Sequence, residues 1–466
     1  MSSHSRLTTA DGGPEAPEPA SKLWDFLRET GIVLLAFLLG ILGIFDITLL
    51  GVLRANEALL AVLAPFAIYQ AFRSQSIRRY RWLLILGLLY LAGQIAADLY
   101  RHNGPEDFLR GWARIGIMLM ALLVSLLWFV RRSKALLAFV FGFFLVAPIR
   151  FVLAGELADE ENAYKMSFGS SISLGAFLFL CIAPKALRVP AAIAPFLAGI
   201  VAILRGGRSL AGITILALAT YWVGRLRLFR GRRISRSRLL ATAALISGTA
   251  WGIFAGYRYA ASTGVLGGKA LEKYEAQSQT FEGGNVSLFL AGRLELLFSG
   301  PKILASPIIG YGSWAKDVDY VWNRAVEAGL DPEEMVGTTE GEVGLIPTHS
   351  HLFGGWLEAG LPGLLFWGFA LFMAMDVLIR QKFIRHPELA PIINYFFVYF
   401  LWDVFFSPFG GDRRLWSGVL IAWMASIYYK NKAERKARPP RGAHAESPRQ
   451  TLRPDRKRQS ILAGHP

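Results

Sequence analysis

The stretch that decides the fold class is "PTHSHLFGGWLEAGLPGLLFWGFALFMAMDVLI", residues 347–379. From Leu361 onward it is almost continuously apolar, and about twenty such residues span the hydrocarbon core of a bilayer as one helix. Its polar start carries His349 and His351. Histidine is the side chain that most readily exchanges a proton near neutral pH. The stretch therefore predicts a membrane helix over 351–379 with two histidines at its mouth.

Similar apolar runs recur along the chain. Of the 466 residues, 53% are hydrophobic and 18% are charged. This composition excludes a soluble protein of the same length, which would carry more charge. We predict an all-α polytopic membrane protein with about twelve spans. They are expected at 30–50, 56–73, 82–99, 109–130, 135–154, 167–184, 190–205, 209–224, 239–258, 351–379, 389–408 and 414–430.

The short connections alternate in charge. Every even-numbered one is basic, as in "RSQSIRRYR" (73–81), whereas the odd ones are poorer in Lys and Arg or acidic, as in "GELADEEN" (155–162). Because Lys and Arg favour the cytoplasmic side, both termini are predicted to be cytoplasmic. The long segment 259–348 is then an outer, periplasmic loop with short helices, in a bacterial inner membrane.

These signals divide the chain into five parts. We expect a disordered cytoplasmic tail (1–28), spans one to nine (29–258), the periplasmic loop (259–348), spans ten to twelve (349–430) and a basic cytoplasmic tail (431–466). The net charge of +16 is explained by membrane orientation and by attraction to anionic lipid. It comes with no nucleic-acid-binding motif, so a phospholipid bilayer is the expected partner and nucleic acid is not.

Several soluble chemistries find no support in the sequence. The phosphate loop, the dinucleotide fingerprint and the His-Glu-x-x-His zinc helix do not occur. The single Cys181 cannot form a disulfide or a thiolate cluster within one chain. His349 and His351 are two residues apart and would project to different sides of a helix, which makes a poor metal pair. No metal and no cofactor are predicted.

Three polar features are expected at the outer boundary of the membrane. "RGGRS" (205–209) carries Arg205 and Arg208 between two spans, where the arginines could contact lipid headgroups or form an anion site at a helix N-terminus. Arg293 interrupts a leucine-rich segment, 287–305, with the pattern of an interfacial helix. His349 is the third, and it is equally open to a simple role at the start of a helix that Ser350 or Thr348 could cap.

Weaker candidates lie at the outer end of spans eleven and twelve. "WDVFFSPFGGDRR" carries Asp403, Arg413 and Arg414. They could contact phosphates of an acceptor, or pair with one another. His351 joins them as a weaker candidate for substrate contact.

The order of these features resembles the O-antigen ligase and O-antigen polymerase superfamily, over roughly residues 195–380. Its members share an arginine at the end of a mid-chain span, a Gly-Arg before a Pro-x-x-Gly-x-Gly turn, and a histidine before a Glu-x-Gly-x-x-Gly run. The matching positions are Arg208; Gly292 and Arg293 with Pro307, Gly310 and Gly312; and His349 with Ser350, Glu358, Gly360 and Gly363. Ser350 replaces the common asparagine.

The resemblance implies a largely helical, GT-C-like glycosyltransferase that acts on the periplasmic face without metal. Its donor would be an O-antigen glycan on undecaprenyl diphosphate, and its acceptor lipid A-core. Arg208 and Arg293 would bind the diphosphate, since guanidinium groups bind phosphate oxygens in pairs. His349 would be the general base.

Two alternatives stay open. A polymerase of O-antigen or exopolysaccharide repeats would use the same donor site with another acceptor. A transporter or lipid flippase would suit about twelve spans, but it predicts two similar halves and interrupted helices at mid-membrane. No convincing internal repeat is seen.

Overall fold

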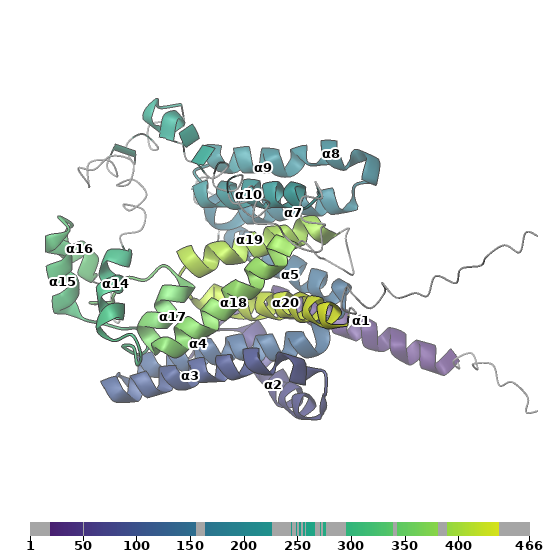
Figure 1. Cartoon of the computed structure of the whole chain (residues 1–466), viewed down its shortest axis with the longest axis horizontal. Coiled ribbons are helices and arrows are strands. Elements are labelled where there is room, and N and C mark those ends of the chain that lie inside the picture. Colours follow the sequence, from purple (N-terminus) through teal and green to yellow (C-terminus); the bar gives the residue numbers. More distant parts are fainter. Residues whose placement is uncertain are drawn as a thin grey trace, which may run out of the picture.

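The computed structural model describes residues 19–49, 51–154, 164–225, 295–338, 343–380 and 389–437, with scattered residues between 244 and 275. The described chain is mostly helical (Figure 1). The elements of the first half are α1 (Pro19–Ile41), η1 (Leu42–Ile44), β1 (Asp46–Leu49), β2 (Gly51–Arg54), α2 (Ala55–Arg73), η2 (Ile77–Tyr80), α3 (Arg81–Arg101), α4 (Pro105–Val124), η3 (Ser125–Phe129) and α5 (Ser133–Ala154).

The second half continues the helical pattern. Its elements are η5 (Tyr164–Phe168), α7 (Gly169–Ile182), η6 (Lys185–Leu187), α8 (Arg188–Ala191), α9 (Ile193–Leu204), α10 (Arg208–Arg225), α14 (Glu295–Ala305), α15 (Val318–Glu327), α16 (Pro332–Val336), α17 (His351–Ala359), α18 (Leu361–Arg380), α19 (Ala390–Phe406) and α20 (Gly411–Lys436).

Seven described helices are long and apolar enough to cross a membrane. They begin at Trp24, Ala55, Ile77, Pro105, Ser133, Lys185 and Leu361. Shorter apolar helices lie at Gly169–Ile182, Arg208–Val223, Leu296–Ala305 and Ala390–Phe406. The chain is therefore a helical membrane protein, whereas twelve spans stay a prediction, because most of the predicted span 239–258 lies outside the described residues.

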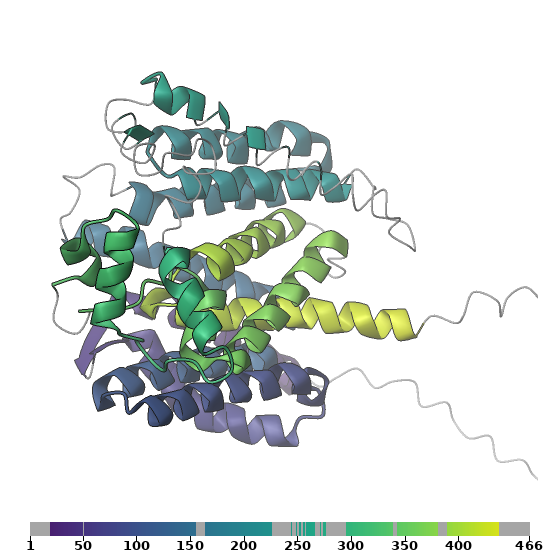
Figure 2. The ribbon, with the colours of Figure 1, turned by 60° about the vertical axis from the view of Figure 1, so that its left-hand side comes forward.

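Helices α1 and α20 extend into the segments predicted as tails. Residues 19–28 were expected in the disordered tail but belong to α1, and α20 runs on to Lys436. Both ends continue a helix beyond the apolar stretch, since few residues there break a helix. The beginning of α1 and the end of α20 lie at the end of the bundle away from α14, α15 and α16 (Figures 1 and 2).

A small antiparallel hairpin interrupts the helical pattern between α1 and α2. Strands β1 and β2 pair Asp46 with Arg54 and Thr48 with Val52. The β-branched residues of this connection favour an extended backbone. The first predicted span was expected to run to residue 50, whereas its helical part ends at Ile44 and this hairpin follows.

The predicted tenth span is two helices rather than one. Helix α17 ends at Ala359, and Gly360 has a φ of 68°, a left-handed value that glycine adopts readily. The break frees backbone groups that the loop 306–312 satisfies: the N–H of Tyr311 donates to the Leu357 carbonyl at 2.8 Å, and the N–H of Leu361 donates to the Ile308 carbonyl at 3.0 Å. The outer end of the bundle is therefore built jointly by α17 and this loop.

Helices α14, α15 and α16 form a small outer layer with its own apolar core (Figure 2). Phe298, Val321 and Ala325 are completely buried there. Asp317 caps α15 by accepting from the Tyr320 N–H at 3.0 Å. Of the interfacial helix predicted over 287–305, residues 295–305 are helical as α14, and residues 287–294, with Arg293, lie outside the described residues.

Candidate functional site

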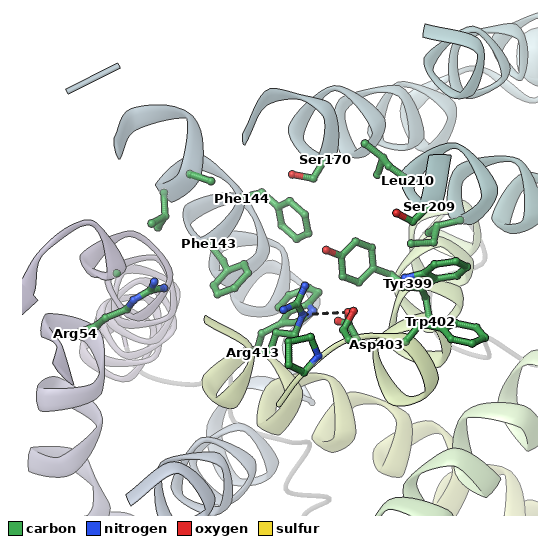
Figure 3. A pocket seen from close by; sticks show the side chains of 18 of the residues that line it. Arg54, Phe143, Phe144, Ser170, Ser209, Leu210, Tyr399, Trp402, Asp403 and Arg413 are labelled. Atoms are coloured by element: carbon green, nitrogen blue, oxygen red, sulfur yellow. Dashed lines mark hydrogen bonds and ion pairs between the residues drawn. The ribbon is translucent and has the colours of Figure 1, made fainter. Parts of the chain in front are cut away.

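A cavity of about 520 Å³ opens between helices from distant parts of the chain (Figure 3). That volume lies within the range of small-molecule sites. Its walls come from η1, β2, α2, α5, α7, α10, α19, the α19–α20 connection and α20. The lining residues are Gly43, Arg54, Asn56, Phe143, Phe144, Val146, Ala147, Ser170, Ser209, Leu210, Ile213, Tyr399, Trp402, Asp403, Phe406, Ser407, Pro408, Arg413 and Trp416.

Two of the weaker sequence candidates meet in this cavity. The Nε of Arg413 on α20 donates to Oδ1 of Asp403 on α19 at 3.2 Å. The Asp403 side chain is 2% exposed and that of Arg413 is 33% exposed. The carboxylate is thus sequestered, while part of the guanidinium stays open to the cavity (Figure 3). Of the two alternatives left open by the sequence, the structure shows the pairing of Asp403 with Arg413, and both residues also line the cavity.

Arg414 has a different position, although it is the next residue. Its guanidinium forms a two-pronged ion pair with Glu57 of α2, which is 1% exposed. Nη2 also donates to the Val52 carbonyl of β2 at 3.0 Å. Arg414 therefore fastens α20 to the hairpin and to α2, and it is not a lining residue.

Besides Arg413, Arg54 is an arginine that lines the cavity. It ends β2, its side chain is 15% exposed, and its Nε lies 3.8 Å from Oδ1 of Asp46. The sequence analysis did not select it. The signal was present, because Arg54 is a lone cation in a connection predicted to face outward, where positive charge is disfavoured.

Arg208 lies beside the cavity rather than in its wall. It is half-buried and begins α10, and the following Ser209 and Leu210 are lining residues. The tight turn before it uses Gly206, with φ at 74°, and Gly207, whose N–H donates to the Ala202 carbonyl at 2.8 Å. The glycine pair thus forms the turn into α10, and the N-terminus of this helix, with the lining residues Ser209 and Leu210, is a position that favours an anion.

Arg205 is placed less favourably. It is exposed, it follows α9, and it does not line the cavity.

The two histidines differ in their exposure to solvent. His349 is exposed. The next residue, Ser350, caps α17 by accepting from the Phe353 N–H at 3.1 Å, and its hydroxyl donates to the Val404 carbonyl at 2.8 Å. The bond to Val404 ties the residue before α17 to the C-terminal part of α19, which lines the cavity. The predicted cap is therefore confirmed, and His349, which does not line the cavity, is exposed one residue before it.

His351 is fully buried. Its ring centre lies 4.8 Å from that of Trp367 and 5.2 Å from that of Phe409. A side chain enclosed in this way packs the core at the start of α17. The structure does not bring His351 to the cavity wall.

The glycine motifs meet at a second place, which we call the loop clamp: Asp98, Arg114, Ser313, Glu358 and Gly360 with the turn 307–312. The Gly312 N–H donates to the Glu358 carbonyl at 2.9 Å. Asp98 accepts from the Ser313 N–H at 2.6 Å and from the Ser313 hydroxyl at 2.7 Å. Arg114 forms a buried ion pair with Glu358. These motif residues hold the outer loop to α3, α4 and α17.

Metal-ligand clusters were also sought. Among the residues that the structure describes, no three His, Cys, Asp or Glu side chains come together as a possible metal site.

In comparisons with known proteins, the chain matches no family model and no curated protein sequence.

Proposed function

We propose that this chain is a glycosyltransferase that transfers an O-antigen glycan from undecaprenyl diphosphate to a sugar hydroxyl of lipid A-core, that is, an O-antigen ligase. One observation carries the proposal. Ser209, which follows Arg208, and Arg413 of α20 line one cavity, although they lie far apart in the sequence. Ser350, which follows His349, donates to the carbonyl of Val404, next to the lining residue Asp403. The order of motifs resembles that of the ligase and polymerase superfamily.

The charges suit a diphosphate leaving group. Arg208 stands at the N-terminus of α10, where the helix dipole and the guanidinium both favour an anion. Stabilising the charge that develops on the leaving oxygen is a large source of rate in such reactions. Arg293, which lies outside the described residues, is assigned the same role on the motif alone.

His349 is the proposed base because it is the exposed histidine next to the cavity. It would take the proton from the acceptor hydroxyl as the oxygen attacks the anomeric carbon. The bond from that carbon to the phosphate oxygen breaks, and undecaprenyl diphosphate leaves with the electron pair. Attack opposite the leaving group inverts the anomeric centre. A periplasmic active site on the inner membrane follows from the charge pattern of the connections.

Arg413 and Arg54 are assigned to anionic groups of the acceptor. Both line the cavity and both have a carboxylate neighbour, Asp403 and Asp46, that orients the guanidinium. Arg205 is a secondary candidate for the donor, and His351 and Arg414 support the site through packing.

A transporter is less well supported. Its mechanism commonly uses interrupted helices whose free carbonyls coordinate ions. The interruption at Gly360 is different, since the carbonyls of Leu357 and Glu358 accept from the N–H groups of Tyr311 and Gly312.

The decisive test is transfer by the purified full-length chain from undecaprenyl-diphosphate-linked glycan to lipid A-core. We expect His349→Ala to lower kcat by about 10²–10⁴-fold, the usual contribution of a general base, with the thermal midpoint unchanged. His102→Asn is the matched control, because His102 is also exposed and asparagine tolerates its left-handed φ of 55°. Full transfer by His349→Ala would contradict the assignment of the base.

Gene deletion separates the ligase from the polymerase. Loss of the whole O-antigen ladder, with lipid-linked polymer accumulating, supports the ligase. A core that carries a single repeat supports the polymerase, and an unchanged ladder excludes both.

A further inference from the structure

One face of α19 is turned toward the cavity. The helix is otherwise almost entirely buried against its neighbours. Four of its residues line the cavity, Tyr399, Trp402, Asp403 and Phe406. They follow the spacing i, i+3, i+4 and i+7, which places them on one side of a helix. Three aromatic rings and one carboxylate thus make a continuous wall.

This wall stands across the cavity from a cation. Figure 3 shows Arg54 at one side, Tyr399 and Trp402 at the other, and Arg413 with Asp403 between them. The ring centres of Trp402 and Phe406 are 4.7 Å apart, so the two rings support each other. Tyr399 and Trp402 line the cavity and are only partly buried, so part of each side chain is exposed.

The mixture of groups fits a sugar better than an acyl chain. A pyranose ring has an apolar C–H face that packs on an aromatic ring and a rim of hydroxyls that needs hydrogen bonds. The cavity offers polar groups to those hydroxyls, among them Ser170, Ser209 and the partly exposed Arg413 side chain. Covering this polar surface with a hydrocarbon chain would desolvate it without new hydrogen bonds, which is costly.

The position of α10 indicates which sugar of the glycan would contact the rings of α19. Helix α10 packs on α19, and Ser209, Leu210 and Ile213 of α10 line the same cavity. A diphosphate held at Arg208 would therefore place the sugar attached to it next to the α19 face.

We propose that Tyr399 and Trp402 form the subsite for the first sugar of the lipid-diphosphate-linked glycan, and that stacking on their rings sets the preference for that sugar. This inference rests on the proposed function, since it takes the donor to be a lipid diphosphate that carries a glycan. Tyr399 and Trp402 contact the substrate and take no part in proton transfer.

The test compares two ligands of the purified full-length chain: undecaprenyl diphosphate with one N-acetylhexosamine, and undecaprenyl diphosphate without sugar. We expect wild type to bind the first more tightly. Trp402→Leu should weaken that binding about tenfold, the size expected for the loss of a stacking partner, and leave the bare lipid unaffected. In transfer assays KM should rise while kcat changes little.

Two further variants make the result specific. Trp402→Phe keeps an aromatic ring and should retain most of the preference for the sugar. Trp82→Leu is the control, because Trp82 lies on α3, is 58% exposed and does not line the cavity. It should bind both lipids as wild type does.

Three outcomes would overturn the inference: an unchanged sugar preference in Trp402→Leu, equal loss of both lipids in that variant, or equal binding of both lipids by wild type. Failure of the proposed function looks different. Wild type would then transfer no glycan to lipid A-core, while the binding comparison would still decide the role of Trp402.

Discussion

The loop clamp and the cavity adjoin at the segment between α19 and α20, yet they use the same residue types in opposite ways. In the clamp, the Arg114 guanidinium is buried, pairs with Glu358 and donates to the Phe409 carbonyl at 3.1 Å. In the cavity, Arg413 is tied to Asp403 but stays one-third exposed. In consecutive positions, Pro408 lines the cavity and the Phe409 carbonyl accepts from Arg114 of the clamp.

The difference separates structural from functional polar groups. A buried charge that is paired and hydrogen-bonded fixes a geometry, and breaking it is costly. A charge that keeps an open side can bind a ligand. The motifs of the resemblance divide in this way: Gly310, Gly312, Glu358 and Gly360 belong to the clamp, whereas Arg208 and His349 lie beside the cavity.

The largest loss of stability is expected from adding a side chain at Gly360, where the backbone of the turn 307–312 lies close. In Gly360→Ala, the new Cβ would lie 2.0 Å from the Ile308 carbonyl oxygen, at a φ of 68°. We expect a loss of about 4 kcal/mol or more in the free energy of unfolding. Gly368→Ala on α18 is the control, since its Cβ would meet nothing within 4 Å. Thermal unfolding in detergent measures the stability of both variants. A wild-type midpoint for Gly360→Ala would contradict the expected steric clash.

A slightly smaller effect is expected from breaking the buried ion pair. Arg114→Ala leaves the Glu358 carboxylate buried and unpaired, which costs about 3–5 kcal/mol. Glu106→Gln breaks the exposed pair of Glu106 with Arg110 and should cost no more than about 1 kcal/mol. If both variants lost the same stability, the buried ion pair of the clamp would contribute no more than the exposed pair.

The smallest effect concerns a peripheral pair in the outer layer. Burial opposes the charged form of Asp317, but hydrogen bonds from Lys302 and the Tyr320 N–H prevail and hold its pKa below the ordinary value. A lowered folded-state pKa stabilises the protein above the unfolded-state pKa of about 3.9. That contribution is lost as the pH falls through the folded-state value.

Asp317→Asn tests this directly, because asparagine keeps the cap on α15. We expect wild type to be more stable by about 0.2–1 kcal/mol from neutral pH down to about pH 5, with the difference shrinking below about pH 4. Unfolding midpoints of both proteins across this pH range measure it. A difference that grows on acidification would have the wrong sign for this pair.

Much of the local structure could be predicted from the sequence. The apolar runs predict the positions of most described helices, because a helix in lipid satisfies its own backbone and needs only length and hydrophobicity. Ser350 was expected among the residues that could cap α17, and Arg208 was expected near the start of α10. Both are local features that depend on neighbours within a few residues.

The grouping of the polar residues required the tertiary structure. The break at Gly360 is stabilised by the Ile308 carbonyl, about fifty residues earlier, so the run 351–379 alone cannot indicate it. The division of Arg413 from Arg414, or of His349 from His351, depends on which neighbours bury each side chain. Hydrophobicity and charge pattern determined that this protein is a helical membrane protein. Packing between distant segments decided which charges are enclosed, because burial and pairing are properties of the folded chain.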